Sequence, residues 1–327
     1  MIQFYQKRDF GTLISDTFTF FKENGKNFFK NYFLINGLLL IFLVVMMVVF
    51  YRGMMEQVFK GNVEGQSYYY QQYFQENTGM LVLAGLVFLV IFLACMLVTY
   101  SYPVLYMKRL AETGDKNITT DQILGDIKKN IKKFLLFFLG MMFVMLPLTL
   151  LIVGLSSFLM VIIIGFFLLI LLIPALVNVV NFTFFDYYHT NRGFFSSLSY
   201  AFRAQFSYPN GREKSPFWKY WGSTLVTYMI INIITGVITM IPMIIVMIAV
   251  FTMQNPEAPD DISGPNKMFE GTMGLVVFVI YGVSIFLSMI MMNFMYVNSG
   301  LMYYDSRTDL HRNVDISEID TIGTNEA

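Results

Sequence analysis

The composition of this 327-residue chain lies outside the usual range of soluble proteins. Apolar residues make up 56% of it and charged residues only 13%, whereas about a quarter of the residues are charged in a typical soluble domain. The single cysteine, Cys95, excludes an intrachain disulfide and a thiolate metal cluster. The formal net charge is zero, so any electrostatic character must come from where the charges lie.

Residues 9–31 open the chain with the pattern of an amphipathic helix. Large apolar side chains recur at helical spacing on one side, and lysines fall on the other. Such a helix lies in the headgroup plane of a membrane, and the alternative is a soluble helix packed on a partner. With no cleavable leader ahead of it, we expect the first apolar run to act as the targeting signal and to remain in the protein.

Six segments are expected to cross a membrane. The longest uncharged stretch, Phe134–Phe185, holds 52 residues. As one helix it would measure roughly 78 Å against a hydrocarbon core of about 30 Å, so it must cross twice. The turn-like cluster Gly154-Leu155-Ser156-Ser157 is the expected break. The predicted spans are 32–51, 80–107, 134–153, 158–185, 223–253 and 273–301.

Two further polar stretches carry the pattern of amphipathic helices. Thr119 and Gln122 fit a capping box ahead of an apolar face, and residues 194–206 repeat the aromatic spacing before the fifth span. We therefore expect an all-α fold, a polytopic membrane helical bundle of six transmembrane helices in three hairpins, each preceded by a cytoplasmic amphipathic helix. An equally simple interpretation of the repeat is that any helix entering a bilayer from a basic loop has this pattern.

The basic residues predict the orientation of the chain. Nineteen lysines and arginines fall on the side of the two termini and three on the other side. The positive-inside rule then places both termini in the cytoplasm. We expect one integral membrane domain, 1–302, followed by a cytoplasmic tail, 303–327, whose acidic and sparsely apolar composition is typical of disorder.

Aspartate, glutamate, histidine, lysine and arginine are missing from the six predicted span cores. Proton-coupled transporters use such residues, so proton coupling through the membrane is not expected. Asp186, His189 and Asp305 lie at cytoplasmic span ends, where we expect water to reach them. The chain has two histidines and no zinc-protease, serine-hydrolase or P-loop motif. We therefore predict no enzyme activity, no catalytic residue, no metal and no cofactor.

Polar residues within the predicted spans gather mostly in the cytoplasmic half. One interpretation is that they form hydrogen bonds between helices, each contributing about 0.6 kcal/mol. The other is that they line a polar vestibule open to the cytoplasm. The candidate vestibule residues are Asn178, Asn181, Tyr228, Asn232, Asn293 and Asn298.

Four lysines crowd the end of the second amphipathic helix. They suit both the negative end of the helix dipole and anionic lipid headgroups. The candidate headgroup contacts are Lys128, Lys129, Lys132 and Lys133.

The end of the sixth span carries a family resemblance. Leu301-Met302-Tyr303-Tyr304-Asp305-Ser306-Arg307 resembles the ending of bacterial multi-pass membrane proteins similar to the membrane domain of glycerophosphodiester phosphodiesterases. Asp16-Thr17-Phe18-x-Phe20-Phe21-Lys22-Glu23-Asn24 resembles the first cytoplasmic helix of that group. Ser306 stands where the group usually has leucine, and no segment remains for a phosphodiesterase barrel. The resemblance implies a bacterial inner-membrane protein without that hydrolase activity.

Three functions are compatible with these observations. The leading one is a non-enzymatic inner-membrane scaffold, or subunit of a membrane complex, that acts through partner or lipid contacts. The alternative is a carrier for a small or amphipathic solute that uses the polar vestibule, and a third is a lipid-handling protein. The expected partners are membrane lipids and, for a scaffold, other membrane or cytoplasmic proteins; no nucleic acid is expected.

Overall fold

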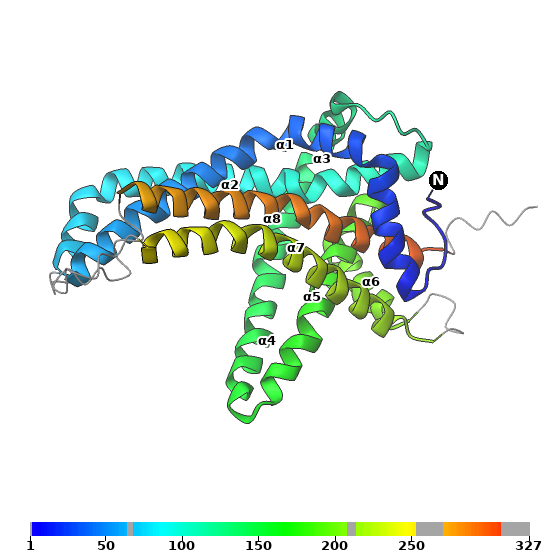
Figure 1. Cartoon of the computed structure of the whole chain (residues 1–327). Helices are drawn as coiled ribbons and strands as arrows, with labels where there is room; N and C mark the ends of the chain where they lie inside the picture. The colour runs from blue at the N-terminus through cyan, green and yellow to red at the C-terminus, as the bar shows by residue number, and fades with distance from the viewer. Residues whose placement is uncertain (1, 64–67, 208–213, 253–270, 309–327) are drawn as a thin grey trace, which may run out of the picture. The chain divides into compact units, whose positions relative to one another are not determined.

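The fold comes from a computed structural model that describes residues 2–63, 68–207, 214–252 and 271–308. Within these ranges every regular element is helical and no strand occurs. The elements, in chain order, are α1 (Phe10–Val63), α2 (Tyr68–Thr113), α3 (Thr120–Gly140), a π-helical segment (Met141–Met145), α4 (Leu146–Phe158), a 3-10 turn (Leu159–Ile162), α5 (Ile164–His189), α6 (Phe194–Phe206), α7 (Phe217–Thr252) and α8 (Gly271–Ser306) (Figure 1).

Six of the described helical stretches are long and apolar enough to cross a membrane. This confirms the all-helical fold class and the six long apolar helices predicted from the sequence. The stretches are Phe10–Phe50, Gln75–Thr113, Thr120–Val161, Ile164–His189, Phe217–Ile244 and Gly274–Ser306.

The chain divides into two compact units. Unit 1 comprises Met1–Phe28, Pro103–Thr227 and Phe294–Ala327, and unit 2 comprises Phe29–Tyr102 and Tyr228–Asn293. Because α1, α2, α7 and α8 each contribute to both units, the long helices are shared between them.

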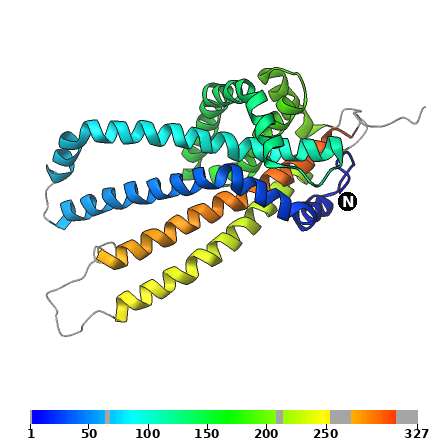
Figure 2. The same cartoon turned by 90° about the horizontal axis from the view of Figure 1, so that it is seen from above.

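Unit 2 consists of segments of four long helices lying side by side in the order α2, α1, α8, α7 (Figure 2). Asn36 of α1 donates a hydrogen bond to Thr99 Oγ1 of α2 over 2.8 Å. Thr239 of α7 and Ser284 of α8 share a hydrogen bond of 2.7 Å between their hydroxyls. Two of the three neighbouring pairs, α1 with α2 and α7 with α8, thus have a polar tie between them, as is usual for helices packed in a bilayer.

Unit 1 contains the shorter helices. The predicted capping box is present at the start of α3, where Thr119 accepts from the Gln122 backbone N–H and the Gln122 side chain accepts from the Thr119 N–H. The π-helical segment Met141–Met145 precedes Pro147, whose missing N–H disturbs the regular hydrogen-bond ladder. The third polar stretch forms α6 over the predicted residues 194–206.

The break between the third and fourth predicted spans lies later than expected. Residues 154–157 are helical within α4, and the chain turns at Leu159–Ile162 and at Ile163, which has a positive φ of 65°. Figure 1 shows α4 and α5 as an antiparallel pair joined there. The glycine that matters is Gly165, because a Cβ atom at that position would overlap the backbone of Ser156 and Leu159, whereas a Cβ at Gly154 would meet nothing within 4 Å.

The predicted spans 32–51 and 80–107 leave residues 52–79 between them, and most of this interval is helical. The helix α1 continues to Val63, and α2 begins at Tyr68. Polar residues outside the predicted spans therefore extend the helices, since glutamine, glutamate and lysine are good helix formers. At the other end of the chain, α8 continues through Tyr303–Ser306, which the sequence had placed in the tail. The predicted disorder of residues 309–327 lies outside the described part of the chain.

The buried residues of α6 are small or polar, whereas three of its phenylalanines are exposed. Ser197, Ala201 and Gln205 are buried, whereas Phe195 is 70% and Phe206 57% exposed. Gln205 donates a hydrogen bond to the Ala175 carbonyl of α5 over 3.1 Å. This distribution is the reverse of that in a soluble helix, whose large apolar residues face the core.

Candidate functional site

The three candidate vestibule residues of unit 1 form hydrogen bonds between helices. Asn178 accepts a hydrogen bond from Thr224 over 2.6 Å, and Asn181 donates to Ser299 over 2.9 Å. Asn298 donates to the hydroxyl of Thr17 over 3.0 Å and exchanges a hydrogen bond with that of Ser223. All three asparagines are buried. Their geometry matches the interpretation in which polar residues join helices.

The other three candidates belong to unit 2. Asn293 is buried and donates to the Ile290 carbonyl of its own helix over 2.9 Å. Tyr228 and Asn232 are exposed, and the Asn232 amide donates to the Tyr228 carbonyl over 2.8 Å. Asn36, which the sequence reasoning missed, is fully buried and bonds to Thr99. A lone asparagine in an apolar run gave no signal beyond its own polarity.

A buried carboxylate near the end of α8 joins three distant segments of unit 1. Asp305 Oδ1 accepts a hydrogen bond from the Arg8 backbone N–H over 2.6 Å. Its Oδ2 atom accepts from Lys219 Nζ over 2.7 Å and from the Tyr220 hydroxyl. Arg8 in turn pairs with Asp16 over 2.9 Å. The residues before α1, the start of α7 and the end of α8 therefore meet at one charge.

A second buried carboxylate lies on α5. Asp186 accepts from Arg307 over 2.6 Å, and Arg192 lies 3.6 Å from the same oxygen. Neither Asp186 nor Asp305 has exposed surface, so the expectation that water reaches them is wrong. The physical reason is that cationic partners replace the water, because a buried charge is tolerated only when it is paired.

His189, which we also expected at a span end in contact with water, forms hydrogen bonds through both of its ring nitrogens. Nδ1 bonds to the Phe185 carbonyl over 3.0 Å, and Nε2 bonds to the Tyr304 hydroxyl over 2.6 Å. These bonds hold the imidazole at the end of α5, where it also lines a pocket.

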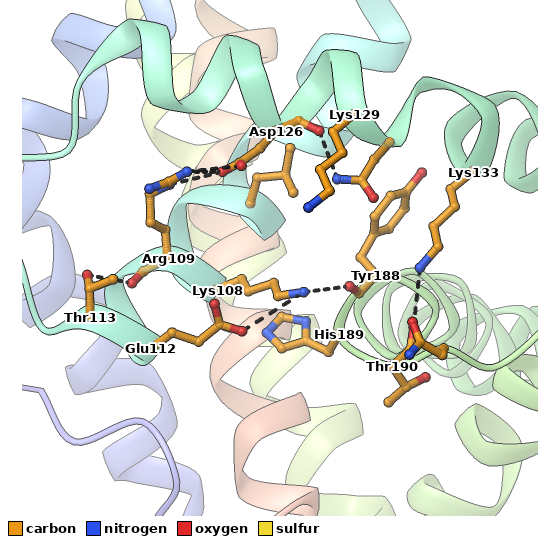
Figure 3. A pocket seen from close by; sticks show the side chains of 13 residues that line it. Lys108, Arg109, Glu112, Thr113, Asp126, Lys129, Lys133, Tyr188, His189 and Thr190 are labelled. Carbon is orange, nitrogen blue, oxygen red and sulfur yellow. Dashed lines mark hydrogen bonds and ion pairs between the residues drawn. The ribbon is translucent and has the colours of Figure 1, made fainter.

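This pocket lies within unit 1 and has a volume of about 570 Å³. Residues from α2, α3 and the end of α5 line it, and Figure 3 shows their side chains. The volume falls within the range of pockets for small ligands, about 300–1,000 Å³. The lining residues are Leu105, Lys108, Arg109, Glu112, Thr113, Asp126, Lys129, Asn130, Lys133, Tyr188, His189, Thr190 and Asn191.

The pocket divides the four predicted headgroup lysines into two pairs. Lys129 and Lys133 line it, whereas Lys128 and Lys132 do not. Successive residues of a helix point about 100° apart, so residues four apart share a face. Lys129 and Lys133 therefore share one face of α3, and Lys128 and Lys132 share another. The sequence grouped the four lysines correctly on one helix but could not separate the pairs.

The pocket offers cationic and hydroxyl groups and little metal-binding capacity. Among the described residues, no group of three or more His, Cys, Asp or Glu side chains is placed to hold a metal ion. The chemistry available is binding of an anion by ammonium groups.

Comparisons of this chain with protein-family models, with curated proteins and with solved structures found no match.

Proposed function

We propose that this protein is a non-enzymatic integral protein of the bacterial inner membrane that acts as a scaffold or subunit of a membrane complex, through contacts with lipids and partner proteins. The observation that carries the proposal is how the polar groups of unit 1 are used. Asn181, Asn298 and Asp305 are buried and bonded between segments, which favours a fixed helical assembly over a solute pathway.

The exposed surface supports placement in a bilayer. Leu38 of α1 is 80% exposed and Val161, which follows α4, is 87% exposed, although both lie in long apolar stretches. A lipid environment removes the cost of exposing such side chains to water. The aromatic side of α6 then rests in the headgroup region, where phenylalanine and tryptophan are favoured.

The proposed topology has both termini in the cytoplasm and three helical hairpins, each preceded by an amphipathic helix. Nineteen basic residues fall on the side of the two termini and three on the other side, which supports this orientation. We further propose a relationship to the bacterial membrane proteins whose ending resembles Tyr303-Tyr304-Asp305. Burial of these residues gives a folding reason for the motif.

The carrier remains the second candidate function because of one polar atom. The Asn178 side-chain N–H₂ group is buried and has no hydrogen-bond partner in the part of the chain that the structure describes. A solute with an acceptor oxygen would satisfy it.

Native extraction into lipid nanodiscs, followed by analysis of intact membrane complexes, tests the scaffold function. We expect the protein to migrate within a larger assembly whose abundance falls when its gene is deleted. A monodisperse protein without partners, together with unchanged membrane assemblies in the deletion strain, would contradict the proposal.

A further inference from the structure

The pocket of unit 1 forms where two apolar helices end. Lys108 and Arg109 follow the apolar run of α2, and Tyr188 and His189 end α5. The polar first half of α3 supplies the remaining wall. Charged side chains at the ends of apolar helices lie at the level of the membrane surface.

The charges that line the pocket are unbalanced. Four cationic side chains face two carboxylates. Asp126 is engaged by two hydrogen bonds of 2.9 Å from Arg109, and Glu112 lies 3.9 Å from Lys108. Lys129 and Lys133 then have no carboxylate within ion-pair distance in the described part of the chain. An anion would complete the charge pairing.

Two of the ammonium groups are held in position by the end of α5. Lys108 Nζ donates to the Tyr188 carbonyl over 3.0 Å, and Lys133 Nζ donates to the Thr190 carbonyl over 3.4 Å (Figure 3). An ammonium has three donors, so Lys133 keeps two for a ligand and Lys108, which also lies near Glu112, keeps at least one. Fixing long side chains before binding lowers the entropy cost of binding.

A buried hydroxyl is a second, independent sign of a ligand. The Tyr188 hydroxyl has no hydrogen-bond partner among the described residues, and the side chain is only 3% exposed. The Tyr188 ring stacks on that of Phe134 with 4.3 Å between the ring centroids. Figure 3 shows the Tyr188 side chain between those of Lys129 and Lys133. Burying an unbonded hydroxyl costs free energy, which a ligand oxygen would recover.

We propose that this pocket binds the phosphate group of an anionic ligand, with Lys129, Lys133 and the Tyr188 hydroxyl as its main contacts. The proposal rests on the proposed function for the position of the pocket at the cytoplasmic membrane surface. The phosphate belongs either to a phospholipid headgroup or to a small soluble phosphate compound. If the lysines served only to cap α5, Lys133 would take part, because it donates to the Thr190 carbonyl. Lys129 would not, because it makes no hydrogen bond to α5.

The test is a titration of the purified full-length protein in a neutral detergent. The probes are dihexanoylphosphatidylglycerol, dihexanoylphosphatidylcholine as a zwitterionic control, and inorganic phosphate, each followed by calorimetry. The pocket variant carries Lys129→Gln and Lys133→Gln. The matched control carries Lys128→Gln and Lys132→Gln, which removes the same charge from the same helix outside the pocket.

We expect the pocket variant to weaken binding of an anionic probe about tenfold or more, since two charge-assisted hydrogen bonds are lost. The control should change the Kd less than about twofold, because Lys128 and Lys132 do not line the pocket and act on the ligand only through solvent, where salt screens their charge. Preference for phosphatidylglycerol over inorganic phosphate assigns the site to a lipid headgroup, and the opposite preference assigns it to a soluble phosphate. Either result supports the proposal.

Two single substitutions keep the test decisive if the double variant fails to fold. Tyr188→Phe removes only the hydroxyl, and Asn130→Asp adds a negative charge to the pocket wall; both should weaken anion binding in a protein that stays monodisperse. The proposal is overturned if neither anionic probe binds, if phosphatidylcholine binds as well as the better of the two anionic probes, or if both lysine pairs lose affinity equally. The gene-deletion experiment does not depend on this titration, so the scaffold function stands or falls separately.

Discussion

The ammonium of Lys219, near the start of α7, donates a hydrogen bond to the buried Asp305 carboxylate near the end of α8 over 2.7 Å. The same ammonium donates to the Arg8 carbonyl over 2.8 Å. One lysine therefore neutralises a buried charge and also holds the segment that precedes α1. Because Asp305 accepts from three groups, its loss would leave several donors unpaired at once.

Replacing this carboxylate should destabilise the protein strongly. Asp305→Ala removes one member of a buried ion pair and is expected to lower the free energy of unfolding by about 3–5 kcal/mol. Asp121→Ala is the control, since Asp121 is exposed in the first turn of α3. Unfolding in detergent mixtures of increasing denaturing strength measures the difference. Equal stability of the two variants would show that the Asp305 network is not a stabilising contact.

The turn between α4 and α5 predicts different outcomes for two glycines. Gly165→Ala places a methyl group against the backbone of residues 156–160 and should cost about 1–3 kcal/mol. Gly154→Ala meets no neighbouring atom and should stabilise α4 slightly, because alanine is the better helix former. Thermal unfolding of the two purified variants compares them. If Gly154→Ala were the less stable of the two variants, the turn would lie at residues 154–157 instead.

The buried and exposed asparagines separate the scaffold from the carrier. Asn298→Leu removes bonds to Thr17, Ser223 and the Leu13 carbonyl, so we expect a loss of stability of about 1–3 kcal/mol. Asn232→Leu alters an exposed side chain and should leave stability unchanged within about 0.5 kcal/mol.

Solute uptake by vesicles that contain a third variant completes this comparison. The variant combines Asn178→Leu, Asn181→Leu and Asn232→Leu. For a scaffold we expect neither the wild type nor this variant to accumulate solute. Transport by the wild type that disappears in a folded variant would establish the carrier instead.

Cysteine labelling tests the orientation. In a Cys95→Ala background, Thr78→Cys and Lys128→Cys place single thiols at exposed positions on α2 and α3. A membrane-impermeant maleimide applied to intact spheroplasts should label Thr78→Cys alone, and both variants once the membrane is opened. Labelling of both positions in intact spheroplasts would contradict an arrangement that puts them on opposite sides.

Much of the fold could be predicted from hydropathy alone. An uncharged run such as Phe134–Phe185 is too long for one crossing, and this argument holds whatever the helices pack against. The capping box at Thr119 could also be predicted from the sequence, because it depends on residues within one helical turn. The position of the following turn was not, because glycine and serine are compatible with a helix wherever neighbouring packing favours it, as at residues 154–157.

The sequence by itself determined that this is an all-helical chain with six apolar helices and four lysines together on α3, since each of these features follows from neighbouring residues along the chain. Only the tertiary structure decided that Asp186 and Asp305 are buried and paired, that Asn181 and Asn298 join helices, and that Lys129 faces a pocket while Lys128 does not. The physical reason is distance along the chain. Asp305 meets Lys219 and Arg8 only after the segments that carry them have packed, and nothing local in the sequence encodes that meeting.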